Sequence, residues 1–299
     1  MEKVTEITVH PDTDRPTKAW EKIKVQQKQR KIKPMDSTTP ISEDKIRFVC
    51  ISDTHTVLEK TPDYHLPPGD VLIHAGDFSN IGRPNEIQRF NTYLGTLPYK
   101  VKIVIAGNHD MTFDAEMVEN HRARMFHSFC ITTAVLEDKL KEYNISSVKE
   151  LLKNCIYLED QELTLCGIKF YGTPWQPEFG GWGFNLKRGR ECLDKWNLIP
   201  DNTDILISHG PPIGYGDKCF GENRAGCVEL LSTIQKRVQP KYLVIYFHQS
   251  SYGVTTDGRT TYINASTCTL RYKASNPPIV FDYPIPDGHT KSELLNFRR

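Results

Sequence analysis

Ile-Arg-Phe-Val-Cys-Ile-Ser-Asp-Thr-His, residues 46–55, is the stretch of this sequence that decides the fold. Residues 46–52 form a nearly continuous apolar run, which is typical of a strand buried on both faces of a sheet. Asp53 and His55 follow the run directly. In open α/β sheets the carboxyl ends of the strands form the crevice that binds ligands. The stretch therefore predicts a buried strand that brings a carboxylate and an imidazole to the rim of an α/β sheet.

The same arrangement, an apolar run followed by side chains with metal-binding atoms, occurs three more times along the chain. The runs at 70–75, 101–106 and 203–208 lead into Gly76-Asp77, Gly107-Asn108-His109-Asp110 and Ser208-His209-Gly210. Any one of these motifs alone is a common loop or turn, and Gly-Asn also reads as a hairpin turn. The ordered set, with each member after a separate strand, predicts one shared site.

Further strands and helices are predicted around these four segments. Strand-like runs occur at 163–171, 242–247, 260–265 and 278–282, and helical stretches at about 84–96, 114–122, 187–196 and 226–238. The last helical stretch places Val228, Leu231 and Ile234 on one side, as in a helix that packs on a core. Strand–helix alternation followed by a strand-rich C-terminal third predicts a layered α/β fold.

Composition and charge argue against several classes of function. The formal net charge is +1, so bulk electrostatics favours no polyanionic partner. No apolar run approaches the roughly 20 residues that span a bilayer, and the N-terminus has no apolar signal-peptide segment. We therefore expect no membrane partner and a cytoplasmic location. The eight cysteines form no Cys-x-x-Cys pair, which favours buried, reduced thiols and fits that location.

Three regions are predicted along the chain: a polar N-terminal tail over 1–44, a globular domain over 45–290 and a C-terminal tail over 291–299. Within the first region, residues 18–33 hold seven Lys or Arg and one Glu. A contact with nucleic acid or an anionic membrane would use such a tract. A solvated tail is the favoured interpretation because aromatic residues are few. Trp20 is the residue expected to pin this tail onto the domain.

The donor types in the four segments suit a pair of metal ions that hydrolyses phosphate esters. Such ions lie about 3.5–4 Å apart. Asp77 is the natural candidate for the bridging carboxylate that they need. Asp53 and His55 lie two residues apart, so both can reach one ion. Asn108 offers an amide oxygen and His209 an imidazole to the second ion. Imidazole and carboxylate together suit Mn, Fe or Zn.

His109 directly follows Asn108, so we expect it to face the substrate and to protonate the leaving oxygen as a general acid. Asp110 lies next to it and is the expected partner that holds one tautomer of the ring. Lowering the pKa of a water between the ions would supply hydroxide near neutral pH. His74, within a predicted strand, reads more simply as a hydrogen-bonded core histidine than as a ligand.

These motifs match a known family. Asp53-x-His55, Gly76-Asp77, Gly107-Asn108-His109-Asp110 and His209 resemble the motifs of the calcineurin-like metallophosphoesterases, over about 46–282. Within that superfamily the chain resembles the animal metallophosphoesterase domain-containing proteins, through 208–212, 226–231, 261–266 and Thr17-Lys18-Ala19-Trp20. The resemblance implies that 45–290 is a metallophosphoesterase domain with a four-layer fold, two central mixed β-sheets flanked by α-helices.

The resemblance also implies a site and an activity. Asp53, His55 and Asp77 would hold one metal ion. Asp77, Asn108 and His209 would hold the other, and His109 would be the acid. Family substrates are phosphomonoesters and phosphodiesters, and this subgroup is associated with weak hydrolysis of cyclic nucleotides and related diesters. We expect Mn²⁺, with Fe, Zn, Mg or Co as alternatives, and a small phosphodiester or nucleotide as ligand. A nucleic-acid partner is not expected, and the oligomeric state is left open.

One family segment is altered in this chain. A Gly-His-x-His motif, with one imidazole for each ion, is expected where the chain reads Tyr246-Phe247-His248-Gln249. Anchoring on Tyr252-Gly253 puts the two imidazole positions at Phe247 and Gln249. Phe247 cannot bind a metal, and Gln249 offers only an amide oxygen. His248 is one residue out of register, so on a strand it would point to the opposite face unless a bulge turned it back.

Two functions follow from this departure. The first is a metal-dependent phosphodiesterase of low activity, because even a disturbed partner of a metal ligand costs about 10–100-fold in affinity or activity. One ion site would then be weak or empty, with Gln249 or His248 filling in. The second is a catalytically impaired family member that binds a nucleotide or a protein. Retention of His109 favours the first, because a pure binder needs no acid. Asn108, His109 and Arg224 are the candidate substrate contacts, Arg224 as a phosphate ligand.

Overall fold

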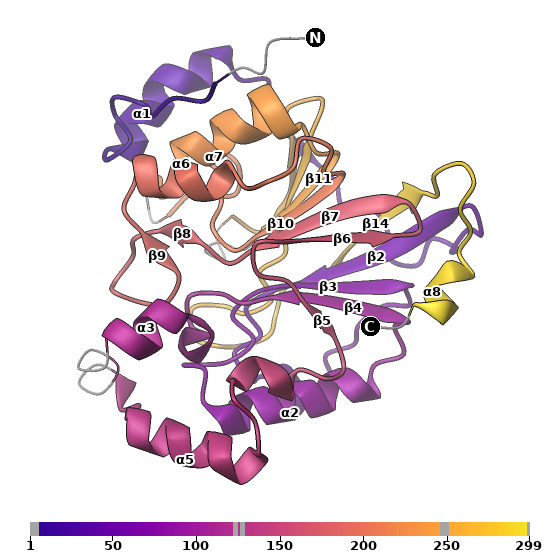
Figure 1. Ribbon diagram of the computed structural model, residues 1–299. Helices are drawn as coiled ribbons and strands as arrows, with labels where there is room; N and C mark the ends of the chain where they lie inside the picture. The colour runs from indigo at the N-terminus through magenta and orange to yellow at the C-terminus, as the bar shows by residue number, and fades with distance from the viewer. Residues whose placement is uncertain (1–5, 122–124, 126–128, 220, 246–250, 298–299) are drawn as a thin grey trace.

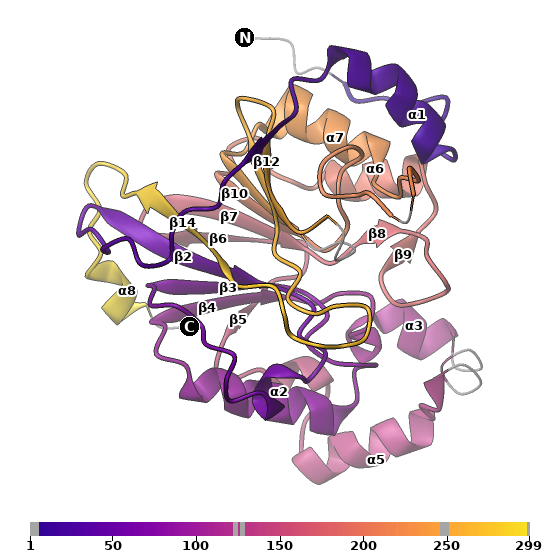
Figure 2. The same cartoon turned by 180° about the vertical axis from the view of Figure 1, so that it is seen from behind.

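The computed structural model describes residues 6–297 apart from 122–124, 126–128, 220 and 246–250 (Figure 1). Two β-sheets lie face to face at its centre, and helices cover the outer face of each sheet (Figures 1 and 2). Apolar residues fill the space between the sheets and the space under each helical layer. The predicted four-layer α/β fold is thereby confirmed.

The five-stranded sheet has the order β14-β2-β3-β4-β5. The middle strands β2 (Lys45–Ile51), β3 (Val71–Ala75) and β4 (Val101–Ile105) run parallel, as does the short β5 (Ile156–Tyr157). β14 (Ile279–Pro284) closes the other edge antiparallel to β2. Because β2, β3 and β4 are parallel neighbours, the residues that follow them leave the sheet at one edge.

The seven-stranded sheet has the order β1-β12-β13-β11-β10-β7-β6 and is mixed. β7 (Ile168–Thr173), β10 (Ile205–Ser208), β11 (Tyr242–Ile245) and β13 (Thr261–Asn264) run parallel. β6 (Gln161–Leu165) and β12 (Gly253–Thr256) are antiparallel to their neighbours, and β1 (Arg30–Ile32) adds an outer strand to β12. The parallel centre of this sheet delivers the end of β10 toward the first sheet.

The outer layers are helical. α2 (Pro84–Thr96), α5 (Thr133–Tyr143) and the 3₁₀ turn Val148–Leu151 cover the five-stranded sheet. α6 (Arg190–Trp196) and α7 (Val228–Thr233), which continues as a π-helix over Ile234–Val238, cover the seven-stranded sheet. The shorter elements are 3₁₀ turns at Lys24–Gln26, Leu58–Lys60 and Met111–Phe113, the helices α1 (Pro16–Ile23), α3 (Ala115–Asn120) and α8 (Glu293–Asn296), and the paired strands β8 (Gln176–Pro177) and β9 (Asn185–Leu186).

Strand alternation explains the layering. Successive side chains of a strand point to opposite faces, so Phe48 of β2 meets Phe170 between the sheets, with ring centroids 5.8 Å apart. Its neighbour Val49 belongs to the cluster beneath α2 instead. Leu206 of β10 faces the α6 and α7 layer. Every one of these strands is thus buried on both faces, as the continuous apolar runs predicted.

Several elements differ from the sequence predictions, and a hairpin and a helix show why. The run 163–171, predicted as one strand, is a hairpin of β6 and β7 whose turn residues Cys166 and Gly167 have φ of +48° and +73°. Two residues with positive φ are what a tight two-residue hairpin turn requires. Helix α5 was not predicted, whereas α2 matches its predicted bounds.

The N-terminal segment is more ordered than a polar tail. α1 packs on the seven-stranded side, where Trp20 is 6% exposed and lies edge-on to Tyr215 at 6.4 Å. Trp20 thus pins the segment to the domain, as predicted. The segment also adds β1 to the sheet, and this contribution was missed. At the other end of the chain, α8 buries Leu294 within the tail predicted for 291–299.

The described residues include no helix that combines the length and the apolar character needed to cross a bilayer. None of the eight cysteines forms a disulfide in the described part of the chain; six are buried, Cys219 is partly buried and Cys130 is exposed.

Candidate metal centre

The candidate metal centre lies where the ends of β2, β3 and β4 meet the end of β10 from the other sheet. Backbone hydrogen bonds join the loops: Asp53 N donates to Gly76 O at 2.9 Å and His55 N donates to Asp77 O at 3.1 Å. The loop after β2 is therefore held against the loop after β3. The order of parallel strands determines which side chains meet here.

Several residues of these loops have a left-handed backbone. φ is +54° at Asp53, +41° at His55 and +57° at Asp77. This conformation costs on the order of 1 kcal/mol or more for a residue with a Cβ, and it concentrates at functional sites. The strain indicates that the loops are shaped for a ligand at some cost in stability.

Three buried carboxylate oxygens in the site lack a hydrogen-bond donor. Within the part of the chain that the structure describes, neither oxygen of Asp53 has a partner, and Oδ2 of Asp77 has none. Asp53 is 2% exposed and Asp77 is 1% exposed. Burying a carboxylate without compensation costs several kcal/mol. These oxygens therefore fit a bound cation, and carboxylate with imidazole is a donor set that transition-metal ions accept.

Two imidazoles face these oxygens with their Nε2 atoms. His55 donates from Nδ1 to Ser79 O at 3.1 Å, and its Nε2 lies 3.7 Å from Asp53 Oδ1 and 3.9 Å from Asp77 Oδ2. His209 donates from Nδ1 to Ala75 O at 3.0 Å, and its Nε2 lies 3.5 Å from Asp77 Oδ1. A carbonyl oxygen can only accept, so each Nδ1 carries the proton. This leaves each Nε2 as a metal-binding atom with a fixed orientation.

Asn108 completes this side of the site. Its Oδ1 lies 3.0 Å from His209 Nε2, and the residue is 5% exposed. The amide oxygen and the imidazole therefore point at the same place, next to Asp77. The structure thus brings together Asp53, His55, Asp77, Asn108 and His209, the five residues with predicted metal-binding side chains in the first four segments.

The electrostatics of the site favours a cation. Burial raises the pKa of Asp53 well above its ordinary value, because a buried carboxylate is poorly solvated. Burial by itself would lower the pKa of His55, but the neighbouring carboxylates of Asp53 and Asp77 raise it to about 9. Burial lowers the pKa of His209, which keeps that imidazole neutral. A second proton on His55, carried by Nε2, partly offsets the buried negative charge; a divalent cation bound by Nε2 would replace that proton and offset the charge further.

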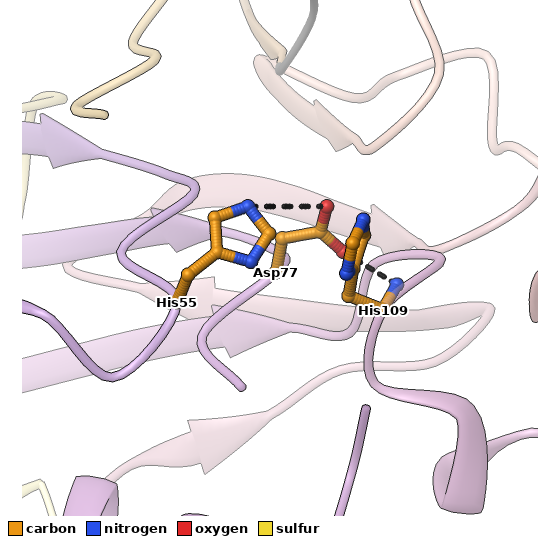
Figure 3. A group of neighbouring side chains, drawn as sticks. All are labelled: His55, Asp77 and His109. Atoms are coloured by element: carbon orange, nitrogen blue, oxygen red, sulfur yellow. Dashed lines mark hydrogen bonds and ion pairs between the residues drawn. The ribbon is translucent and has the colours of Figure 1, made fainter. Parts of the chain in front are cut away.

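His109 also lies within this cluster. The ligand atoms of His55, Asp77 and His109 all lie within 4.8 Å of one another, and the three side chains point toward one space (Figure 3). The backbone N–H of His109 donates to Asp77 Oδ1 at 2.8 Å, and its Nδ1 donates to Asn80 O at 2.8 Å. The remaining nitrogen, Nε2, is left to act on a metal ion or a substrate.

Comparison with known sequences identifies the family. Residues 46–256 match the sequence profile described as calcineurin-like phosphoesterase. The chain belongs to this family. Metallophosphoesterase domain-containing protein 1 of Homo sapiens, like that of Mus musculus, is 51% identical over 256 residues, covering 85% of this chain and 76% of the relative. Two UPF0046 proteins of Caenorhabditis elegans are 44% and 42% identical over 95% of this chain, covering 72% and 98% of their own lengths. The predicted family is confirmed.

Asp110 has a different position from the one expected in this calcineurin-like phosphoesterase. Its Oδ2 accepts from Asp77 N at 2.9 Å and Gly107 N at 2.8 Å, and its Oδ1 accepts from Ser79 N at 2.9 Å and Ser79 Oγ at 2.6 Å. The partner of His109 Nδ1 is a backbone carbonyl, so the expectation that Asp110 holds the tautomer is wrong. Asp110 instead ties the loop after β4 to the loop after β3.

Glycines allow the loops to approach this closely. A Cβ on Gly76, whose φ is +97°, would lie 2.5 Å from His209 Nδ1 and 2.8 Å from Ala106 O. A Cβ on Gly107 would lie 2.6 Å from Asp77 N and would also overlap His209. Any side chain at either position would displace a candidate ligand. This is the physical reason for glycine directly before Asp77 and Asn108.

His74 is the core histidine that was predicted. It is fully buried, and its Nε2 lies 2.9 Å from Thr54 Oγ1 between Asp53 and His55. Its ring lies edge-on to Phe78 and Phe90. Burial lowers the pKa of His74 to about 3, so it stays neutral. Through its contact with Thr54, His74 supports the loop after β2.

The sequence reasoning missed three contributors to the site. The Asn80 and Ser79 carbonyls orient His109 and His55, but a backbone carbonyl has no sequence signature. Trp182 stacks on His109, with ring centroids 4.0 Å and planes 27° apart. The signal that could have found it is the run Gly180-Gly181-Trp182-Gly183, a large aromatic in a glycine-rich loop. The Gly183 N–H donates to Asn108 O at 3.1 Å, so this loop rests directly on the metal-binding loop.

Two further predictions concern residues away from these contacts. Phe247, His248 and Gln249 lie outside the described residues, so the interpretation of the segment that replaces the Gly-His-x-His motif stays a prediction. Arg224, predicted as a phosphate ligand, pairs with the buried Asp217 at 2.6 Å and lies over the ring of Trp20 at 5.0 Å. Its charge is therefore compensated within the protein, on the side of the N-terminal helix.

Proposed function

We propose that this chain is a metal-dependent phosphodiesterase of low activity that acts on cyclic nucleotides or related small diesters. The observation that supports the metal most directly is the set of three buried carboxylate oxygens, on Asp53 and Asp77, for which the described residues supply no donor. No ordinary stabilising role accounts for such oxygens beside two oriented imidazoles. Membership of the calcineurin-like phosphoesterase family supports hydrolysis of a phosphate ester.

Two ion positions share Asp77 in this proposal. Asp53 and His55 serve the first, and Asn108 and His209 serve the second. Mn²⁺ is the proposed ion, with Fe, Zn, Mg and Co as alternatives, because carboxylate, amide and imidazole donors suit all of them to different degrees. When bound, such ions supply Lewis-acid activation of the phosphoryl group and of the attacking water.

His109 is proposed to give a proton to the leaving oxygen. Its Nδ1–H is held by Asn80 O at 2.8 Å, so donation requires the imidazolium form, in which Nε2 has also taken up a proton, and this Nε2 proton is the one that moves. Burial lowers the pKa of His109, which makes the imidazolium a stronger acid. The stacked indole of Trp182 and the hydrogen bond to Asn80 O hold the ring in this orientation. Because Asp110 contacts the loop backbone and not this ring, its proposed role is to position the loop.

The charge around the site favours a diester over a monoester. In the described hydrogen bonds and ion pairs of the site residues, no Lys or Arg takes part. A phosphodiester carries one negative charge, whereas a monoester carries close to two near neutral pH. With no side-chain cation to help the metal ions, the singly charged ester is the better match. Nucleic acid and membrane have no place in this proposal.

Low activity is proposed because of the sequence Tyr246-Phe247-His248-Gln249, which lacks both imidazoles of the family motif. The same observation favours a second candidate function, a catalytically impaired protein that binds a nucleotide or a protein partner. A cytoplasmic location completes the proposal, and the free thiols are compatible with a reducing compartment.

One experiment separates these functions. The purified chain is loaded with Mn²⁺, and metal stoichiometry is measured alongside hydrolysis of bis-(p-nitrophenyl) phosphate, with Asp77→Asn as the matched control. We expect one to two ions per chain and slow turnover that the control loses. Two ions with fast turnover would contradict the claim of low activity. Metal binding without turnover would favour the binding protein, and no metal binding at all would refute the proposal.

A further inference from the structure

Tyr272 stands at the rim of the candidate metal centre with its ring half in solvent. Its ring centroid lies 4.8 Å from that of His55, with the planes at 87°, so it meets the metal-binding imidazole edge to face. The residue is 51% exposed. Tyr272 thereby presents an aromatic surface beside the place where the phosphate would bind. Neither the proposed metal ligands nor the proposed acid, His109, accounts for this surface.

The loop that carries Tyr272 is built onto the site itself. Thr267 N donates to Ser52 O at 3.0 Å, and Ser266 forms a bridge with Ser52, the residue directly before Asp53. A second bridge joins Cys268 to Ala274 and closes the loop at its base. The position of Tyr272 relative to the metal-binding residues is therefore set by backbone contacts, over a sequence separation of more than 200 residues.

The backbone at Tyr272 is strained, and the packing of its half-exposed ring does not explain why the strain is kept. Its φ is +53°, a left-handed value that is costly for a bulky residue and easy for Gly or Asn. The bonds Tyr272 N to Thr269 O at 2.8 Å and Thr269 N to Lys273 O at 2.9 Å hold this turn in place. A large aromatic kept both strained and exposed is better explained by a ligand than by packing.

The chemistry of the side chain fits a flat apolar group next to a phosphate. Burial of part of the ring, with the nearby carboxylates of Asp77 and Asp53, raises the pKa of Tyr272, so its phenol is neutral at physiological pH. A neutral phenol does not repel a phosphate ester, and its ring can stack on a nucleobase or an aryl group.

We propose that Tyr272 is a specificity-determining residue that stacks on an aromatic group, nucleobase or aryl, in the part of the phosphodiester that stays on the phosphate when the leaving oxygen departs. This inference rests on the proposed function and adds a substrate class to it: diesters whose retained group carries a flat aromatic ring close to the phosphate. Diesters with only aliphatic groups bind without this contact.

Two substrates with the same leaving group test the proposal. Bis-(p-nitrophenyl) phosphate and methyl p-nitrophenyl phosphate both release p-nitrophenolate and differ only in the group that is retained. With the Mn²⁺-loaded full chain, Tyr272→Asn is expected to raise KM for the diaryl ester by about tenfold, the scale of one lost stacking contact. KM for the methyl ester is expected to change by less than about twofold. Tyr272→Phe, which keeps the ring, is expected to match the wild type on both.

Loss of folding would not produce a KM change for one ester alone. Asn tolerates the left-handed backbone, so Tyr272→Asn is expected to have a melting temperature equal to or above that of the wild type. Equal KM changes for the two esters, or no change for either, would overturn the inference. If the wild type hydrolyses neither ester, the proposed function fails, and binding of phenyl phosphate and methyl phosphate to the Mn²⁺-loaded chain decides the inference instead. Tyr272→Asn must then weaken only the phenyl compound; any other pattern, including no binding, refutes the subsite.

Discussion

The indole of Trp182 and the imidazole of His109 stack with ring centroids 4.0 Å apart. The indole also packs on Phe129, with centroids 4.6 Å apart, so it has a second aromatic contact. His109 is fixed at its other edge by the bond from Nδ1 to Asn80 O. The orientation of the proposed acid thus depends on a residue of a different loop, between β8 and β9.

Replacing Trp182 by Leu is therefore expected to impair proton donation more than substrate binding. We expect kcat to fall by roughly tenfold for diesters with alcohol leaving groups, as part of the about 10²–10⁴-fold that general acid catalysis supplies. The loss should be small for p-nitrophenolate, which needs no proton. A plot of log kcat against the pKa of the leaving group should steepen in the variant. Trp182→Phe serves as the control that keeps a stacked ring, and an equal loss for all leaving groups would contradict a role through His109.

Asp110 accepts four hydrogen bonds, three of them from the neighbouring metal-binding loop after β3, and its removal leaves buried donors without partners. Asp110→Ala is expected to lower the free energy of unfolding by about 3 kcal/mol. Mn²⁺ affinity should fall together with stability, because Asp77 N is one of the donors. Urea denaturation and a metal titration measure the two effects. Ser79→Ala removes a single bond from this set, together with the bond that Gly82 N donates to Ser79 Oγ at 2.8 Å, and should cost about 1–2 kcal/mol; an equal cost for the two variants would refute the linking role.

Gly76 and Gly258 have the same backbone φ but different surroundings. Both have φ of +97°, but a Cβ on Gly76 would lie 2.5 Å from His209 Nδ1, and a Cβ on Gly258 would meet nothing within 4 Å. Gly258→Ala is expected to cost about 1 kcal/mol of stability from backbone strain alone and to leave metal binding unchanged. Gly76→Ala is expected to cost about 1–3 kcal/mol more and to lower Mn²⁺ affinity at least tenfold. Equal metal affinities in the two variants would show that crowding of His209 does not matter.

Asp12 makes the stability of the N-terminal segment dependent on pH, because its carboxylate pairs with Arg15, Lys18 and Lys22 of the same segment. The hydrogen bond from Lys22 lowers the pKa of Asp12 from 3.8 to about 2, with Lys18 contributing further. A carboxyl whose pKa is lower in the folded state stabilises that state fully above pH about 4 and loses the contribution as pH falls toward about 2. Asp12→Asn removes this dependence. We therefore expect the stability difference between wild type and variant to shrink between pH 5 and pH 3, as measured by urea unfolding followed by tryptophan fluorescence. A constant difference over that range would contradict the assignment.

Much of the fold could be predicted because a buried strand is recognisable in the sequence as a run of apolar residues. The runs 70–75 and 101–106 differ from β3 and β4 by one residue at one end, since a strand buried on both faces is apolar throughout. The hairpin at Cys166-Gly167 was missed for the same reason. Apolar residues continue on both sides of its turn, and a single Gly does not distinguish a turn from a strand that contains a glycine.

The candidate site was predictable only where its residues follow strands. Asp53, Asp77 and Asn108 leave adjacent parallel strands, and the topology alone puts them together. Trp182 and Tyr272 come from loops whose course depends on contacts far away in the sequence, such as Thr267 with Ser52. Asn80 contributes a carbonyl oxygen, which every residue has. Apart from the glycine-rich setting of Trp182, no pattern in the sequence encodes contributions of this kind.

Substitutions in the segment that replaces the Gly-His-x-His motif test most directly why activity should be low. The double variant Phe247→His with Gln249→His supplies the two imidazoles that the family motif has and this sequence lacks. If the other ligands are in place, metal stoichiometry should rise toward two and the rate of bis-(p-nitrophenyl) phosphate hydrolysis should rise with it. At least a tenfold gain is expected, the lower limit for restoring a metal ligand when even a neighbouring partner is worth about 10–100-fold. Each single variant should restore one donor and give a smaller gain. A rise in metal content without a rise in rate would locate the defect at His109 and Trp182, and no rise in either would show that the first four segments do not form a competent centre.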